Sequence, residues 1–177
     1  MEENHDIRPA GPHGGCESAP YQVATLILDA TLGFCQRFCE RDSIAAVRMA
    51  QAARNGRQGI VDGSKDVAAS KWMSLTLLGR AQASLEELLL DFHEFLRQAG
   101  LPLWRLEHPQ AQRVRDLAAA GCWSELAGAA ASSPEPAANT LICLTLQASA
   151  LLDQQLRRLE REFLDEGDFD ATFSPAG

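Results

Sequence analysis

Residues 51–64, "QAARNGRQGIVDGS", form a helix-like stretch with unusually small side chains and two internal glycines. A helix turns by about 100° per residue, so small and apolar residues at 3–4 spacing fall on one side. Each glycine inside a helix costs about 1 kcal/mol relative to alanine, so a compensating contact is needed. We therefore predict that a neighbouring helix packs closely against the stripe Ala45, Met49, Ala52, Gly56 and Ile60.

The helix that contains this stretch is bounded by recognisable end signals. Asp42 and Ser43 precede it and can cap its start, and Gly63 follows its last apolar residue. The polar side of this helix carries arginines, with Arg54 and Arg57 on its flank.

Three further amphipathic helices are predicted from apolar residues at 3–4 spacing. They run from Tyr21 to Glu40, from about Ser70 to Gly100, and from about Asn139, as N-cap, to Asp165. No segment shows the alternation of a half-buried strand. The predicted fold is all-α, an up-down antiparallel four-helix bundle.

The remaining segments interrupt or flank this bundle. Residues 101–137 are predicted to be an insertion of two short helices between helices three and four, docked through Trp104 and Trp123. Residues 1–20 and the acidic segment 166–177 are expected to be disordered tails, which leaves 21–165 as the bundle.

The first predicted helix is apolar nearly all round, and this has two interpretations. It is either a fully buried central helix or a helix that contacts a second subunit. Because each helix of a four-helix bundle should keep one solvated side, we favour a subunit interface.

Composition narrows the class of protein. The chain has 177 residues, 46% of them hydrophobic. It has no apolar run long enough to cross a membrane, and its first residues do not have the pattern of an export signal. A cytoplasmic location and five reduced cysteines are therefore expected. The net charge of −8 disfavours a surface that is basic throughout.

Basic residues nevertheless gather in one part of the chain. Between Arg41 and Arg80 there are seven basic and three acidic residues. Repeated in an oligomer, such a cluster would hold nucleic-acid phosphates; the alternative is a solvated face with salt bridges to Asp62, Asp66 or Glu87. The candidate nucleic-acid-binding residues are Arg48, Arg54, Arg57, Lys65, Lys71 and Arg80.

Motifs for catalysis or for a cofactor are not found. His93 is the one histidine in the long helices, and Leu90 stands where a di-iron Glu-x-x-His motif would need its glutamate. Cys35 and Cys39 are one turn apart on an apolar stripe, which favours buried structural thiols over a metal site. We expect neither an enzyme nor a bound metal or cofactor.

Two segments resemble a known family. "MAQAARNGRQGIVDGS" and "AQASLEELLLDFHEFLRQAGLPLW" are similar to the second and third helices of the bacterial four-helix-bundle family first noted as intervening-sequence insertions in 23S rRNA genes, and most of all to its four helix bundle suffix domain subgroup. The resemblance covers about Tyr21 to Leu103 and, less specifically, the final helix. Its motif residues are Gly59, Ile60, Asp62 and Gly63, then Ser84, Leu85, Glu87, Leu88 and Leu89.

The chain departs from the family pattern at a few positions. Gly59 and Asp62 stand where relatives have asparagine and glutamate, and Trp72 and Met73 replace a polar run at the start of the third helix.

The resemblance implies a left-handed antiparallel bundle that assembles into a homopentameric ring. In one branch of the family, the accessory protein of diversity-generating retroelements binds a reverse transcriptase and nucleic acid through a basic surface. We therefore expect a non-catalytic homo-oligomeric accessory protein that binds RNA, DNA or a reverse-transcriptase-like protein. The alternative is a protein-interaction scaffold that binds no nucleic acid.

Overall fold

The computed structural model describes residues 19–40, 43–65 and 70–165. The elements in this part of the chain are all helices: α1 (Ala19–Phe38), α2 (Ile44–Lys65), α3 (Lys71–Ala99), α4 (Pro109–Ala119), α5 (Trp123–Ala130) and α6 (Pro134–Asp165). The all-α prediction is confirmed for these residues. The two predicted tails lie outside them, except that α1 begins at Ala19, inside the predicted tail.

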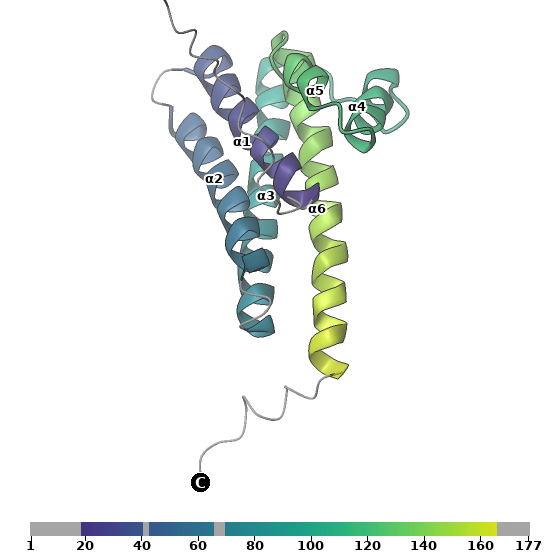
Figure 1. Ribbon diagram of the computed structural model, residues 1–177. Coiled ribbons are helices and arrows are strands. Elements are labelled where there is room, and N and C mark those ends of the chain that lie inside the picture. Colours follow the sequence, from purple (N-terminus) through teal and green to yellow (C-terminus); the bar gives the residue numbers. More distant parts are fainter. Residues whose placement is uncertain (1–18, 41–42, 66–69, 166–177) are drawn as a thin grey trace, which may run out of the picture.

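The four long helices pack in the order α1, α2, α3, α6, and α6 returns to α1. Neighbouring helices run in opposite directions, and α1 covers only the half of α6 nearest to where α6 begins (Figure 1). At the other end the molecule consists of α2, α3 and α6 alone among the described elements. The shorter α1 therefore leaves the two ends of the molecule unlike each other.

The contact between α2 and α3 is unusually close because α2 presents glycines to α3. A Cβ added to Gly59 would lie 2.8 Å from the Cβ of Ala81 and 3.0 Å from the carbonyl oxygen of Leu77. Added Cβ atoms at Gly56 and Gly63 would similarly meet the side chains of Leu85 and Leu78 at 2.9 and 2.7 Å. The predicted close approach is confirmed, although Ala45, the first residue of the predicted stripe, is exposed.

Aromatic rings fill the end of the core where α1 meets α3. Phe34 of α1 makes edge-to-face contacts with Phe92 and Phe95 of α3, with ring centroids 5.2 and 4.7 Å apart. Such pairs add about 0.5–1.5 kcal/mol each to the burial of the rings themselves. They hold α1 against α3 near the end of each of these two helices.

Helix ends follow their sequence signals at α2 and α3. The Ser43 hydroxyl accepts from the backbone N–H of Ala46, and the Ser70 hydroxyl accepts from that of Met73. At the other end of α3, Gly100 adopts a left-handed conformation with φ of 65°, and the N–H of Leu101 then donates to the carbonyl of Leu96. The predicted bounds of α2 and α3 are thus close to those observed.

The predicted start of the last helix is wrong. The helix α6 begins at Pro134, so the insertion ends at residue 133 rather than 137. Proline is well suited to the first turn because the N–H that it lacks would have no helical partner there. Asn139 is a buried interior residue whose side chain accepts from the N–H of Trp104 and donates to the carbonyl oxygens of Pro102 and Glu135.

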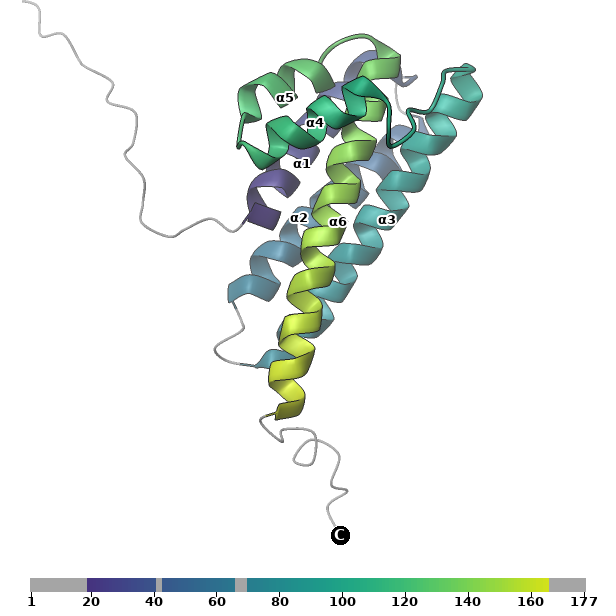
Figure 2. The ribbon, with the colours of Figure 1, turned by 90° about the vertical axis from the view of Figure 1, so that its right-hand side faces the viewer.

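The insertion packs on the bundle through polar anchors as well as through its core residues. Figure 2 shows α4 and α5 lying across the end at which α6 begins. The indole N–H of Trp104 donates to Glu135, and the Arg37 guanidinium of α1 donates to the carbonyl oxygens of Ala130 and Ala131 at the end of α5. Trp104 and Trp123 both pack against the core, as predicted.

We predict that Gly59→Ala destabilises the protein by about 1–3 kcal/mol, because the new methyl group would press against backbone atoms of α3 that cannot move aside. Gly128→Ala is the matched control. A Cβ there meets no atom within 4 Å, so alanine should leave stability unchanged or raise it by up to about 1 kcal/mol. Urea unfolding followed by circular dichroism measures both. Equal effects of the two substitutions would contradict the close approach of α2 and α3.

Candidate functional site

Arg48, the first residue of the predicted basic cluster, is engaged within the chain. Its guanidinium donates through Nε and Nη2 to both carboxylate oxygens of Asp91 on α3. The Asp91 side chain is 7% exposed, whereas that of Arg48 is 58% exposed. The hydrogen bonds and the negative charge of Asp91 raise the pKa of Arg48. The arginine therefore neutralises a buried carboxylate between α2 and α3.

Arg57 is engaged on the other side of α2. Its Nε donates to the Thr25 hydroxyl at 3.1 Å and its Nη2 donates to the Tyr21 hydroxyl at 2.9 Å, both on α1. The guanidinium carbon also lies 5.2 Å from the centre of the Tyr21 ring. Nine residues separate Arg48 from Arg57, which places them about 180° apart around the helix.

The other candidate residues are in different situations. Arg54 and Arg80 are exposed, and Lys71 is half-buried, while the side chain of Lys65 lies outside the described residues. The six residues thus do not form one continuous basic face. Two of them connect α2 to its neighbours, and two project into solvent.

Large exposed apolar side chains gather on α3 and α6 instead of on α1. Every large apolar side chain described on α1 is buried or half-buried by its own chain. By contrast, Leu90 on α3 is 66% exposed and Leu164 on α6 is 63% exposed, and Trp72 is exposed as well. The apolar excess of α1 that favoured a subunit interface is therefore covered by α2, α5 and α6.

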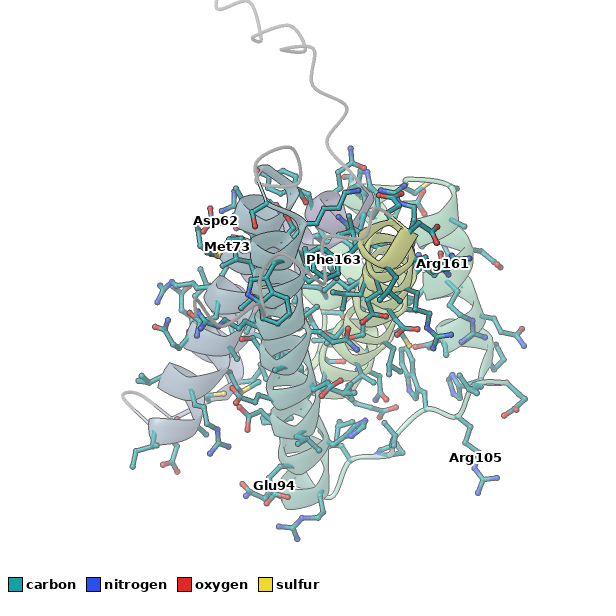
Figure 3. All side chains as sticks on the ribbon, turned by 90° about the horizontal axis from the view of Figure 1, so that it is seen from below. Asp62, Met73, Glu94, Arg105, Arg161 and Phe163 are labelled. Carbon is teal, nitrogen blue, oxygen red and sulfur yellow. The ribbon has the colours of Figure 1, made fainter. Side chains whose placement is uncertain are left out.

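A groove follows the seam between α3 and α6 at the end that α1 does not reach. We call it the seam groove; its volume is about 490 Å³ and its lining includes Trp72, Leu75, Gly79, Leu156, Phe163 and Leu164. Phe163 lies on the side of α6 that faces α3, and Arg161 lies on the opposite side (Figure 3). Gly79 lies at the edge of this groove, and a Cβ added to it would meet no atom within 4 Å. In contrast to the glycines of α2, this glycine has no close neighbour among the residues that the structure describes.

A second exposed apolar patch lies at the start of α2, and we call it the α2 patch. It consists of Ile44, which is 84% exposed, and Val47, one turn further along. Both side chains lie on α2, whereas the seam groove is formed by α3 and α6. The α2 patch and the seam groove are therefore separate apolar surfaces on different elements.

The largest cavity described lies between the insertion and the bundle, and we call it the insertion cavity. Its volume is about 710 Å³, within the usual range for small-molecule sites. Its apolar walls come from the 101–108 segment and α6: Leu103, Trp104, Leu106, Ile142, Cys143 and Leu146. Asn139 fixes one of these walls through its bonds to Pro102 and Trp104.

Polar groups at the insertion cavity are few. His93, Arg105, Glu107, Arg115 and Gln147 contribute to its lining. Burial raises the pKa of the Cys143 thiol, which keeps it protonated and poorly nucleophilic, and no hydrogen bond joins it to His93 among the described contacts. The cavity thus has the features of a binding site and lacks an activated nucleophile.

The two cysteines of the "CQRFC" motif are free thiols, as are the other cysteines of the described part. The neighbouring Cys39 thiol and partial burial raise the pKa of Cys35, whose sulfur lies 3.7 Å from the carbonyl oxygen of Ala46. In the part of the chain that the structure describes, no three His, Cys, Asp or Glu residues are grouped so as to hold a metal ion.

The sequence analysis missed both the seam groove and the insertion cavity. A signal for the former is Trp72, a large apolar residue that stands in place of a polar run at the start of the third helix and lines the groove. The signal for the latter is weaker. "LPLWRL" has too many apolar residues for an exposed loop, but nothing in it indicates that α6 provides the opposite wall.

No family model, no curated protein and no solved structure matches the chain. The family resemblance therefore stays an expectation. None of the described helices combines the length and the apolar character needed to span a membrane.

We predict that Arg48→Met lowers the free energy of unfolding by about 1–2 kcal/mol, because the buried Asp91 carboxylate loses its partner. Arg54→Met is the control, since Arg54 is an exposed arginine of the same helix, and it should change stability by less than about 0.5 kcal/mol. Chemical denaturation at neutral pH measures the difference. If the two variants unfold alike, Arg48 has no structural role.

Proposed function

We propose that α1, α2, α3 and α6 form an up-down antiparallel four-helix bundle with α4 and α5 as its insertion, and that the protein is a non-catalytic homo-oligomeric scaffold. The observation that carries this proposal is the pair of separate apolar surfaces, the α2 patch and the seam groove. Isolated exposed apolar residues are common on monomers, but a projecting patch and an apolar groove together suit an interface.

The positions of the two surfaces support one way in which subunits would associate. In a closed ring each subunit uses one surface against a different surface of the next subunit, whereas a two-fold dimer uses the same surface twice. Ile44 and Val47 project from α2, and the seam groove is a depression between α3 and α6. We infer that the α2 patch of one subunit enters the seam groove of the next.

Gly79 supports a close approach at the groove. A glycine inside a helix costs about 1 kcal/mol, and no described residue packs against this one. The open space beside it leaves room for a neighbouring subunit to approach the groove closely. The family resemblance suggests five subunits, and a ring of five is compatible with contacts between unlike surfaces.

A non-catalytic role is supported by the character of the perturbed groups. The pKa values of the partly buried thiols Cys35 and Cys143 are raised, that of Cys39 is lowered by its hydrogen bond with Cys35, and that of Arg48 is raised by an ion pair, and neither Cys35 nor Cys39 lines the insertion cavity. Strongly perturbed groups that converge in a cavity would instead favour catalysis.

We predict that the wild-type protein sediments at about five times its chain mass of 19.2 kDa. Introducing a charge into either surface, by Val47→Asp or Leu164→Asp, should give monomers, because each buries a carboxylate in the interface. Sedimentation equilibrium at micromolar concentration measures the mass. Gln51→Asp, an exposed position on α2, and Leu106→Asp, an exposed leucine outside the seam groove, are the controls and should remain assembled.

Mixing the two monomeric variants tests the pairing of unlike surfaces. The Val47→Asp chain keeps an intact seam groove and the Leu164→Asp chain keeps an intact α2 patch, so the mixture should form a one-to-one dimer. A two-fold interface would give no such dimer. Wild-type protein that stays monomeric, with native helix content, contradicts the scaffold proposal as a whole.

Nucleic-acid binding is a second candidate function, favoured by the exposure of Arg54 and Arg80. Neither forms an ion pair with a carboxylate among the described residues. A ring would repeat these cations around its circumference and so raise the local positive potential. Arg48 and Arg57 contribute less to phosphate binding because their guanidinium groups already donate to Asp91 and to Thr25.

We predict that any binding of a single-stranded RNA is weak, falls steeply with salt, and is lost in the Arg54→Gln/Arg80→Gln variant. Fluorescence anisotropy of a labelled oligonucleotide at low and physiological salt measures it. Arg113→Gln, an exposed arginine of the insertion, is the control. If no binding is detected at low salt, the protein scaffold without nucleic acid is the remaining function.

A further inference from the structure

We propose that the insertion cavity binds a small amphipathic anion, with its apolar body against α6 and the 101–108 segment and its anionic head at Arg115. The proposal is independent of the association of subunits, because the cavity is formed entirely within one chain. The ligand class is an unbranched or ring-containing apolar molecule with one carboxylate, sulfonate or phosphate group.

The walls of the cavity determine the apolar part of the ligand. Leu103, Leu106 and Leu146 are exposed large side chains at its rim, and Ile142 is buried behind them. Exposed leucines are costly in water at about 25 cal/mol per Å² of apolar surface. Three of them around one cavity, rather than scattered, indicate a site that an apolar molecule covers.

The charge of the head group follows from Arg115. This side chain of α4 is half-buried, and its Nη2 donates to the carbonyl oxygen of Leu106 at 2.6 Å, which holds it at the cavity. Among the described residues no carboxylate forms an ion pair with it. Arg115 is thus a positive charge held at the cavity without an ion-pairing carboxylate among the described residues, and an anionic head group would supply the missing counter-charge.

Other groups at the cavity agree with an anionic ligand. The Arg115 guanidinium opposes the burial-induced rise in the pKa of the Cys143 thiol, so its positive field reaches α6 across the cavity. Arg105 adds a second positive charge and Glu107 one negative charge, and the half-buried His93 forms part of the wall. Figure 3 shows Arg105 at the outer side of this segment, where it faces solvent, whereas Arg115 is the less exposed of the two arginines.

Arg113 distinguishes this site from ordinary surface charge. It lies two residues from Arg115 on the same helix, is exposed, and has Glu125 as an ion-pair partner at 3.6 Å. Its guanidinium does not line the cavity. The two arginines therefore form a matched pair, of which only one should affect binding.

The test uses the full chain and decanoate as the probe, below the concentration at which decanoate forms micelles. Isothermal titration should show saturable binding of one decanoate per chain, accompanied by a change in tryptophan fluorescence because Trp104 lines the cavity. Decanol and decyltrimethylammonium, which keep the tail and remove or reverse the charge, should bind at least about tenfold more weakly.

Variants connect the binding to the cavity. Arg115→Gln should weaken decanoate binding by about tenfold or more, Arg115→Lys should restore part of it, and Arg113→Gln should leave it unchanged. Leu146→Glu tests the site without altering Arg115; it places a carboxylate at the rim and should abolish binding while thermal unfolding shows that the fold is retained.

Three results would overturn the proposal. Binding of decanol as tight as that of decanoate would show an apolar surface without head-group selection. An unchanged affinity in Arg115→Gln would place the anion elsewhere. Binding to anionic phospholipid vesicles, or to an amphipathic peptide, without any binding of free decanoate would assign the cavity to a membrane or to a protein partner instead.

Discussion

The close approach of α2 to α3 is the constraint on which the rest of the structure depends. It is possible only because Gly56, Gly59 and Gly63 leave room for side chains and backbone of α3. Glycine weakens a helix by itself, so these three positions are stable only when the neighbouring helix packs against them. The result is a two-helix unit against which α1 and α6 then pack.

This unit also determines the roles of the arginines. With the glycine side of α2 against α3, Arg48 reaches across to Asp91. Arg57 lies about 180° around the helix axis from Arg48, beside α1. Each guanidinium thus provides a polar link from α2 to a neighbour. A concentration of basic residues in one segment of the sequence therefore does not imply a basic surface, because a helix distributes neighbouring residues over all its sides.

The seam groove and the insertion cavity both arise where neighbouring elements cover the long helices only in part. Because α1 is shorter than α6, the seam between α3 and α6 carries exposed Trp72 and Leu164 beyond the end of α1. At the other end the insertion packs across α6 and is held by Asn139, Trp104 and Arg37. It packs without filling all the space beneath it, and the insertion cavity is the result.

The sequence by itself determined the helical class, the approximate position of all six helices and the close contact made by the small residues of α2. These properties depend on local periodicity, on capping residues such as Ser43 and Ser70, and on side-chain volume. All three can be read from residues close together in the sequence. The start of α6 was predicted wrongly because an asparagine can either cap a helix or form hydrogen bonds in the core. Asn139 takes the second role because Pro102 and Trp104 lie beside it, and their position is not evident from the sequence. Which arginines are engaged, which apolar residues stay exposed and where a cavity remains were decided by the tertiary structure. Each depends on pairs of residues far apart in the sequence, such as Arg48 with Asp91 or Leu106 with Leu146, whose proximity no local pattern contains.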